Sequence, residues 1–179
     1  HISQEHMDSF YKTIDEIKDD YFDGMILTGA PVEQMPYEQV DYWKELCEIF
    51  EFAKTHVYSS MFICWGAQAS LYYHYGIDKR LLDKKVFGVF EHKVVRPHNP
   101  LVRGFDEIFH APHSRHTDVP VEKLRADDRI TILAESDEAG AFLSMAKDGR
   151  QIFVMGHPEY DRMTLDQEYK RDLSKGLPI

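Results

Sequence analysis

Cysteine is scarce in this chain of 179 residues, which contains only Cys47 and Cys64. Two cysteines are too few for the disulfide framework of a small secreted domain, and no segment has the charged and apolar regions of a signal peptide. The sequence therefore predicts a protein of the reducing cytoplasm whose thiols are free for chemistry.

Long apolar runs and an excess of positive charge are also absent. No run approaches the roughly 20 apolar residues that a membrane-spanning helix needs, so we expect a soluble protein with no membrane role. The chain has 21 Lys and Arg against 31 Asp and Glu, which gives a net charge of −10. Proteins that bind nucleic acids normally present a basic face, so we expect no nucleic-acid partner.

One domain is expected over residues 1–179, because this length can bury a real core but is short for two domains. The chain opens without Met and stops at "GLPI", just past a helical pattern. These ends favour the interpretation that the sequence is a piece of a longer protein.

The first half alternates strand-like and helix-like patterns. Short apolar runs bounded by turn residues predict buried strands at residues 21–29 and 57–64. Apolar residues that recur every three or four positions predict a helix capped by Ser3 and further helices within residues 40–55 and 66–76. Strands that alternate with helices at these lengths indicate βαβ units and a parallel sheet.

The second half predicts shorter strands, several of them antiparallel, followed by a final helix. These strands are expected at residues 86–95, 107–112, 130–136, 141–148 and 150–157. The fold class that we predict is a three-layer α/β domain, with a mostly parallel sheet flanked by helices and an antiparallel extension.

Reactive side chains follow the strands whose carboxyl ends should meet at one edge of the sheet. Cys64 lies at a strand-to-helix turn, where the helix N-terminus is expected to favour its thiolate. The backbone amides of Trp65 and of Ala30, in the 29–31 loop, could hold an oxyanion. His157 and Glu159 follow another strand, so the imidazole could reach the thiol while the carboxylate orients it.

Other interpretations of these residues remain open at this point. A lone cysteine at a strand end is most often a small buried apolar residue, and Cys47, on the apolar face of a helix, is interpreted that way. Residues 110–116, "HAPHSRH", invite a metal site, but their spacing gives no pair of ligands one helical turn apart with a third ligand. We therefore expect no metal.

Five segments together resemble a known family. They are "DGMILTGAPVE", "ICWGAQA", "FGVFEHKV", "APHSRHTDV" and "GHPEYDRMTLDQEYKRD". In this order they closely resemble the homoserine O-acyltransferases of bacterial methionine biosynthesis, over nearly the whole chain. The resemblance implies a class I glutamine amidotransferase-like fold, also described as flavodoxin-like, and transfer of an acyl group from acyl-CoA to the hydroxyl of L-homoserine. The family also has an N-terminal strand segment and a C-terminal tail that this chain lacks.

The resemblance also assigns roles to individual residues. It implies that Cys64 is the acyl-thioester nucleophile, that His157 is the general base and that Glu159 is its partner. It further implies that Lys85, Ser114 and Arg171 bind substrate, with Arg171 clamping the homoserine carboxylate. Without the resemblance, the charged surroundings of Lys85 and Arg171 predict solvated surface residues.

Glu33, two residues after "GAP", bears on the acyl donor. In this family a glutamate at this position is associated with acetyl-CoA and a glycine with succinyl-CoA. A carboxylate there would fill the acyl pocket and repel the free carboxylate of a succinyl group. The sequence therefore predicts a homoserine O-acetyltransferase that uses acetyl-CoA as co-substrate and no cofactor.

Three alternatives to this function remain. One is succinyl-CoA as the donor. Another is a class I glutamine amidotransferase, which shares the fold and the cysteine turn, although Phe62 stands where those enzymes usually have glycine. The third is a non-catalytic binding or scaffold protein in which Cys64 is a core residue. The sequence leaves open whether the protein is a homodimer.

Overall fold

A seven-stranded sheet forms the centre of the computed structural model, which describes residues 3–177. The strands are β1 (Phe22–Leu27), β2 (Val57–Ile63), β3 (Arg80–Val94), β4 (Ile108–Asp118), β5 (Ile130–Ser136), β6 (Gly140–Ala146) and β7 (Gln151–Val154). The helices are α1 (Gln4–Phe10), α2 (Ile14–Ile17), α3 (Trp43–His56), α4 (Trp65–Tyr75), α5 (Val121–Ala126) and α6 (Thr164–Ser174). Short 3₁₀ turns, η1 and η2, lie at Tyr37–Gln39 and Pro100–Val102. The last residues of "GLPI" and the first two of the chain lie outside the described residues.

The strand order is β1-β2-β7-β6-β5-β3-β4. β1, β2 and β7 pair in parallel, while every pairing from β7 onward to β4 is antiparallel. The α/β class and its antiparallel extension are thus confirmed, but the parallel part is smaller than expected. Among consecutive strands, β1 and β2 are joined through α3 and pair in parallel, whereas β5, β6 and β7 follow one another through short turns and therefore pair antiparallel.

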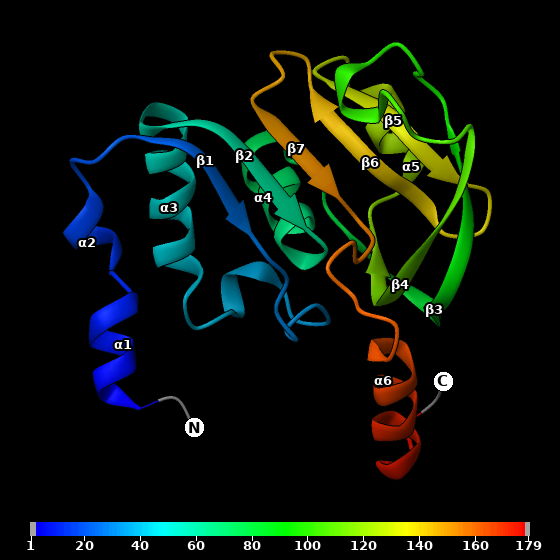
Figure 1. The fold of residues 1–179 in the computed structure, drawn as a ribbon, viewed down its shortest axis with the longest axis horizontal. Helices are drawn as coiled ribbons and strands as arrows, with labels where there is room; N and C mark the ends of the chain where they lie inside the picture. The colour runs from blue at the N-terminus through cyan, green and yellow to red at the C-terminus, as the bar shows by residue number, and fades with distance from the viewer. Residues whose placement is uncertain (1–2, 178–179) are drawn as a thin grey trace.

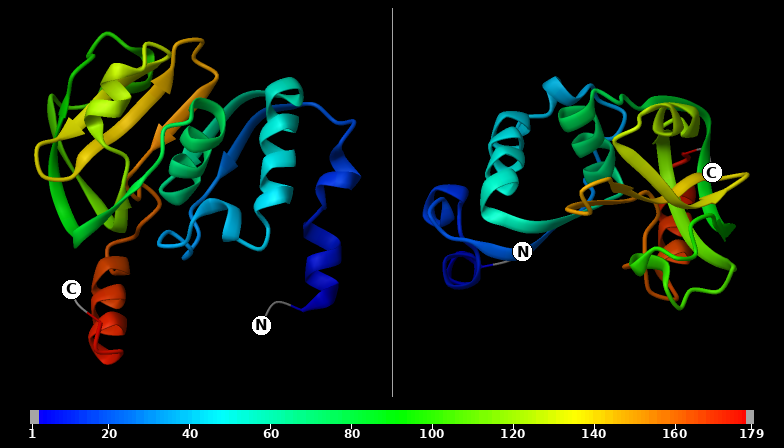
Figure 2. Two further views of the ribbon diagram at one scale, coloured as in Figure 1. Left: turned by 180° about the vertical axis from the view of Figure 1, so that it is seen from behind. Right: turned by 90° about the horizontal axis from the view of Figure 1, so that it is seen from above.

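The helices cover the sheet unevenly. α3, α4 and α5 lie on one face (Figure 2), where Phe50 and Leu71 join Phe62 and Phe153 of the strands in the larger core cluster. The other face is covered by the segment that contains η2, and Val102 of that segment packs into a second cluster with Phe142. The expected third layer is therefore made by a loop rather than by helices.

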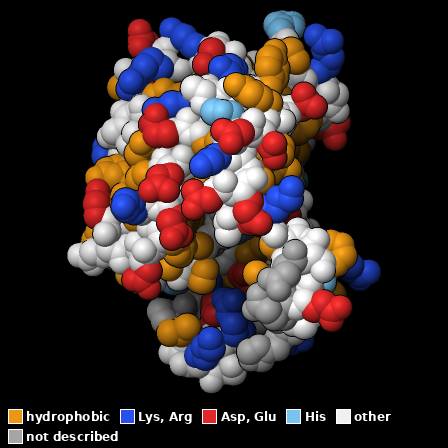
Figure 3. Space-filling model, turned by 90° about the vertical axis from the view of Figure 1, so that its left-hand side faces the viewer, with side chains coloured by type: hydrophobic (Ala, Val, Ile, Leu, Met, Phe, Trp, Pro, Cys, Tyr) orange, Lys and Arg blue, Asp and Glu red, His pale blue; other side chains and the backbone are white. Residues whose placement is uncertain are grey.

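The N-terminal segment differs from the single helix that the pattern predicts. The Ser3 hydroxyl accepts from the amide of His6, as a helix cap does, but α1 ends at Phe10. Thr13 then begins α2, because the Glu16 carboxylate accepts from the Thr13 amide at 2.7 Å. Figure 3 shows this side of the molecule, where acidic, basic and apolar side chains are intermixed.

The carboxyl ends of β1, β2 and β7 point toward the same end of the sheet, and α6 extends beyond that end (Figure 1). The loops after these three strands are therefore neighbours in space. None of the described helices is long and apolar enough to cross a bilayer.

Candidate active site

A cavity of about 800 Å³ opens at this end of the sheet. All nine residues that the sequence predicts for the site line it. They come from the loops after β1, β2 and β7, from the first residue of α4, from β3 and β4, and from α6. Within residues 3–177, no three His, Cys, Asp or Glu side chains gather as the ligands of a metal ion would.

Cys64 occupies a sharp turn between β2 and α4. Its backbone has φ 52° and ψ −119°, and among the described residues it is the one non-glycine residue with positive φ. The turn is tight because Gly66 lies against the end of β1, where an added Cβ would come within 2.8 Å of the Leu27 carbonyl oxygen. This geometry holds the thiol at the top of β2, 7% exposed as a residue, at the floor of the cavity.

The thiol of Cys64 is protonated in this environment. Burial raises its pKa to about 12, and the Glu33 carboxylate adds to the rise. The Arg115 guanidinium and the Trp65 amide act in the opposite direction without offsetting it. The helix N-terminus does favour the thiolate, through the Trp65 amide, but desolvation by burial has the larger effect on the pKa of Cys64.

Two backbone amides beside Cys64 are available for an anion. The loop after β1 lies directly against the cysteine turn, since a Cβ on Gly29 would be 3.4 Å from the Trp65 nitrogen. In the described part of the chain, neither the Trp65 nor the Ala30 amide donates to another backbone group, whereas the Ala30 carbonyl accepts from Val32 at 2.8 Å. The Ala30 amide therefore has no backbone acceptor in this part of the chain, whereas the Trp65 amide interacts with the Cys64 sulfur and lowers the pKa of the thiol.

His157 is held on two sides. Its Nδ1 lies 2.8 Å from Glu159 Oε1, and its ring stacks on Tyr160 with centroids 4.2 Å apart. Because a carboxylate only accepts hydrogen bonds, the neutral imidazole in this geometry carries its proton on Nδ1 and its lone pair on Nε2. No hydrogen bond joins Cys64 and His157 among the described residues, so the structure brings them into one cavity without direct contact.

Glu33 is fixed across the cavity. Its carboxylate accepts from the His116 amide at 3.0 Å and lies 3.1 Å from the Thr117 hydroxyl, whose one proton is shared with Gln68 Oε1 at 2.9 Å. The two oxygens are thus held by the backbone and side chain of β4 rather than by solvent. The loop-surface environment that is usual for a glutamate does not apply here.

Lys85 and Arg171 meet at a shared carboxylate. The Lys85 ammonium donates to Asp172 at 2.7 Å, and Arg171 donates to the other oxygen of Asp172 at 2.8 Å. The Lys85 side chain is 6% exposed, so the solvated position that its neighbours in the sequence predict is wrong, whereas the Arg171 side chain is 51% exposed. The ion pair with Asp172 is what allows the ammonium to be buried.

Glu168 and Tyr160 are site residues that the sequence reasoning missed. The Glu168 carboxylate accepts from the Ser114 hydroxyl at 2.6 Å and from the Tyr160 hydroxyl at 2.7 Å. A signal was present, because Glu168, Arg171 and Asp172 are spaced by three and four residues and so share one face of α6. The missing information was which face of that charged helix turns toward the sheet.

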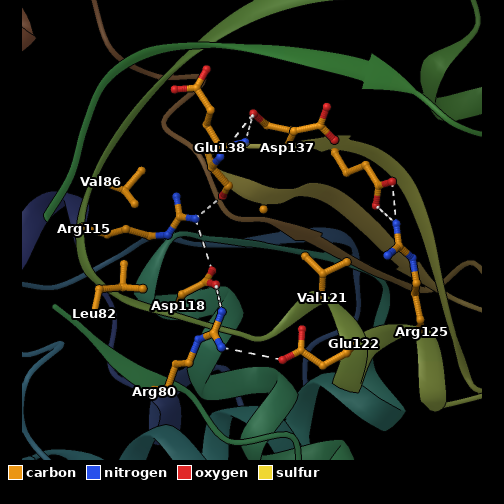
Figure 4. A pocket seen from close by; sticks show the side chains of 14 residues that line it. Arg80, Leu82, Val86, Arg115, Asp118, Val121, Glu122, Arg125, Asp137 and Glu138 are labelled. Carbon is orange, nitrogen blue, oxygen red and sulfur yellow. Dashed lines mark hydrogen bonds and ion pairs between the residues drawn. The ribbon is translucent and has the colours of Figure 1, made fainter. Parts of the chain in front are cut away.

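A second cavity, of about 320 Å³, lies beside β4 (Figure 4). Arg115 points into this region, whereas its neighbour Ser114 lines the first cavity, as expected for consecutive residues of a strand. Figure 4 shows the charged side chains there joined in pairs, with Asp118 between Arg115 and Arg80. Three basic and five acidic side chains line the second cavity, so its lining is acidic on balance although several of these side chains are paired.

Comparisons with known proteins agree with this architecture. The family model described as homoserine O-succinyltransferase matches residues 1–179. The chain is 63% identical over 179 residues to a homoserine O-acetyltransferase of Agathobacter rectalis, covering all of this chain and 58% of that protein. It is 55% identical over 175 residues to a homoserine O-acetyltransferase of Bacteroides fragilis, covering 98% of this chain and 57% of that protein. The chain therefore spans somewhat more than half the length of these relatives.

Solved structures of low sequence identity share the fold. A glutamine amidotransferase from Thermotoga maritima aligns with a TM-score of 0.63 at 17% identity, over 84% of this chain and 64% of that one. A putative GMP synthase component from Thermoplasma acidophilum aligns with a TM-score of 0.63 at 19% identity, over 90% of this chain and 79% of that one. These likenesses confirm the glutamine amidotransferase-like fold. Together with the match over its whole length, they lead to one conclusion: the chain belongs to the homoserine O-succinyltransferase family.

Proposed function

We propose that the protein transfers an acetyl group from acetyl-CoA to the hydroxyl of L-homoserine, through a thioester on Cys64. One observation carries the proposal. A cysteine in a strained turn shares a cavity with a histidine whose tautomer is fixed by a glutamate. Nucleophile, base and orienting carboxylate are the groups that acyl transfer through a covalent intermediate needs.

The first half-reaction forms the thioester. His157 Nε2 takes the proton of the Cys64 thiol, and the sulfur attacks the carbonyl carbon of acetyl-CoA. Because the resting thiol has a pKa of about 12, a base is required at neutral pH, and the two side chains must approach each other when substrate binds. The amides of Trp65 and Ala30 donate to the oxygen that becomes negative. The bond to the CoA sulfur then breaks, and CoA leaves with the proton from His157.

The second half-reaction consumes the thioester. His157 takes the proton of the homoserine hydroxyl, whose oxygen attacks the acetyl carbon. The bond to Cys64 breaks, O-acetyl-L-homoserine is released, and the cysteine sulfur recovers the proton. Arg171 binds the carboxylate of homoserine from the rim of the cavity, while Lys85 and Ser114 complete the substrate contacts.

Acetyl rather than succinyl transfer follows from the position of Glu33. Its carboxylate is held against β4 by the His116 amide and the Thr117 hydroxyl, which limits its ability to turn away from the acyl group. A succinyl group would bring a second carboxylate toward it in a partly buried space, where like charges repel more strongly than in water.

The test is the intact mass of the protein after separate incubation with acetyl-CoA and with succinyl-CoA, without homoserine, beside a Cys64→Ser variant. We expect an acetyl adduct that requires Cys64 and disappears when homoserine is added. A succinyl adduct alone would refute the role given to Glu33. No adduct from either donor, with release of ammonia from glutamine, would replace the proposal by glutaminase chemistry.

A further inference from the structure

Asp172 is a buried carboxylate that the proposed chemistry does not use. It is the residue of α6 that the structure buries, at 5% exposure, while its neighbour Leu173 is 59% exposed. A helix that packs by apolar contact would do the opposite. The burial of Asp172 therefore depends on its polar partners.

Those partners are the two cations of the cavity. Asp172 Oδ2 accepts from Lys85 Nζ at 2.7 Å, and Asp172 Oδ1 accepts from Arg171 Nε at 2.8 Å. These two hydrogen bonds hold the pKa of the Asp172 carboxyl at about 2, so the group is ionised at neutral pH. Each carboxylate oxygen thus fixes one positive charge.

Little else holds the Lys85 ammonium in place. The register of β3 against β4 shifts between Leu81 and Val86, so Lys85 lies in a bulge outside the ladder of backbone hydrogen bonds. Its ammonium also lies 4.5 Å from the centre of the Phe87 ring, a contact that is weaker than a charged hydrogen bond. α6 begins near the ends of β3 and β4 (Figure 1), and the hydrogen bond from Lys85 to Asp172 joins the helix to this part of the sheet.

We propose that Asp172 is a positioning residue, which holds Lys85 and Arg171 at the separation at which they receive the carboxylate of the amino-acid acceptor. Lys85, Arg171 and Asp172 together carry one net positive charge, which suits one carboxylate group, while the nearby Glu168 carboxylate is engaged by the Ser114 and Tyr160 hydroxyls. Without Asp172 the two like charges repel each other and separate. This inference rests on the proposed function, and it concerns the second half-reaction only.

The experiment compares Asp172→Asn with the unchanged protein in two measurements. The first is the rate of thioester formation from acetyl-CoA without homoserine, and the second is the KM for homoserine in the complete reaction. We expect Asp172→Asn to raise the KM for homoserine at least about 10-fold, the scale of one charged hydrogen bond. Thioester formation should stay within about 3-fold, since a merely structural loss would reduce both.

Two further variants complete the design. Asp166→Asn removes the Asp166–Lys170 pair on the same helix, whose carboxylate is 41% exposed and outside the cavity, and should leave both measurements unchanged. Asp172→Glu keeps the charge but displaces it by one methylene, so its KM should lie between those of the unchanged protein and Asp172→Asn. If Asp172→Asn does not fold, Asp172→Glu decides: a raised KM with normal thioester formation supports the inference.

The outcomes separate the two proposals. Absence of a thioester in the unchanged protein would refute the proposed function. The role of Asp172 would be overturned, and the proposed function kept, if Asp172→Asn formed the thioester normally and had an unchanged KM for homoserine. Where Asp172→Asn does not fold, the same result in Asp172→Glu would overturn it. The inference would also be overturned if Asp172→Asn slowed thioester formation as much as it slowed the complete reaction. That result would show general damage to the site.

Discussion

Replacing Gly66 by Ala tests whether the cysteine turn depends on close approach to the end of β1. An added Cβ would lie 2.6 Å from Leu27 Cδ2, 2.8 Å from the Leu27 carbonyl oxygen and 2.9 Å from the Thr28 carbonyl oxygen. Side chains can rotate away, but the two oxygens belong to the backbone that carries the 28–30 loop. Either that loop or α4 must move.

These contacts allow the loss in the free energy of unfolding of Gly66→Ala to be worked out. Overpacking of this kind costs roughly 1–3 kcal/mol, whereas the better helix propensity of Ala returns at most about 1 kcal/mol. With two of three overlaps on backbone atoms, we expect a net loss of about 2 kcal/mol in the free energy of unfolding. For a chain of this size that corresponds to a melting temperature lowered by roughly 4–8 °C.

The assay is thermal unfolding followed by circular dichroism, together with the rate of thioester formation. A matched control is Gly24→Ala in β1, where an added Cβ would meet only the Ser59 carbonyl oxygen at 3.7 Å. Gly24→Ala should change the melting temperature far less and leave the thioester rate intact. A melting temperature of Gly66→Ala equal to that of the unchanged protein, or equal to that of Gly24→Ala, would refute this reasoning.

Two further predictions concern titration. Because the pKa of Cys64 is raised to about 12, its alkylation by iodoacetamide should keep accelerating above pH 9, and a rate that levels off near pH 7 would instead indicate a thiolate paired with an imidazolium. Burial lowers the pKa of His74 to about 4, so the folded state resists a proton that the unfolded chain accepts below about pH 6.5. Stability should therefore fall as the pH drops from about 6.5 toward 4, and His74→Phe should reduce that slope by up to one proton in pH-dependent denaturation; an unaltered slope would contradict the assignment.

The parallel half of the fold could be predicted because its elements carry their own periodicity. The strand predicted at residues 57–64 is observed as Val57–Ile63, and the helix predicted at residues 66–76 as Trp65–Tyr75. Both predictions depend on local patterns of apolar residues. The end of the helix is also marked by Gly76, whose φ is 69°. No partner distant in the sequence is needed to recognise them.

The antiparallel half was harder for a physical reason. The strands predicted at residues 86–95 and 107–112 extend in the structure over Arg80–Val94 and Ile108–Asp118. Their additional residues include Arg115, which is 1% exposed and paired with Asp118. A charged residue in a sequence suggests an exposed loop, because its burial depends on an oppositely charged partner that only the folded structure brings close.

The residues of the candidate site also divide into those that local patterns predict and those that depend on distant strand pairing. Cys64, His157 and Glu159 could be placed from the ends of the strands that precede them, since parallel strands bring their carboxyl ends together. Ser114 and Lys85 could be named only from the resemblance to the family. Their places depend on the pairing of β3 with β4 and on the bulge within it, and neither has a local pattern.

The backbone conformation of Cys64 has a consequence for the stability of the fold. Its φ of 52° with ψ of −119° is a conformation that glycine adopts freely and other residues adopt at a cost of roughly 1–3 kcal/mol. A glycine at this position would therefore make the folded protein easier to maintain while removing its thiol. The cysteine therefore keeps its thiol at a cost in folding stability that glycine would avoid. The turn is thus a place where stability and activity are traded directly against each other, within a single residue.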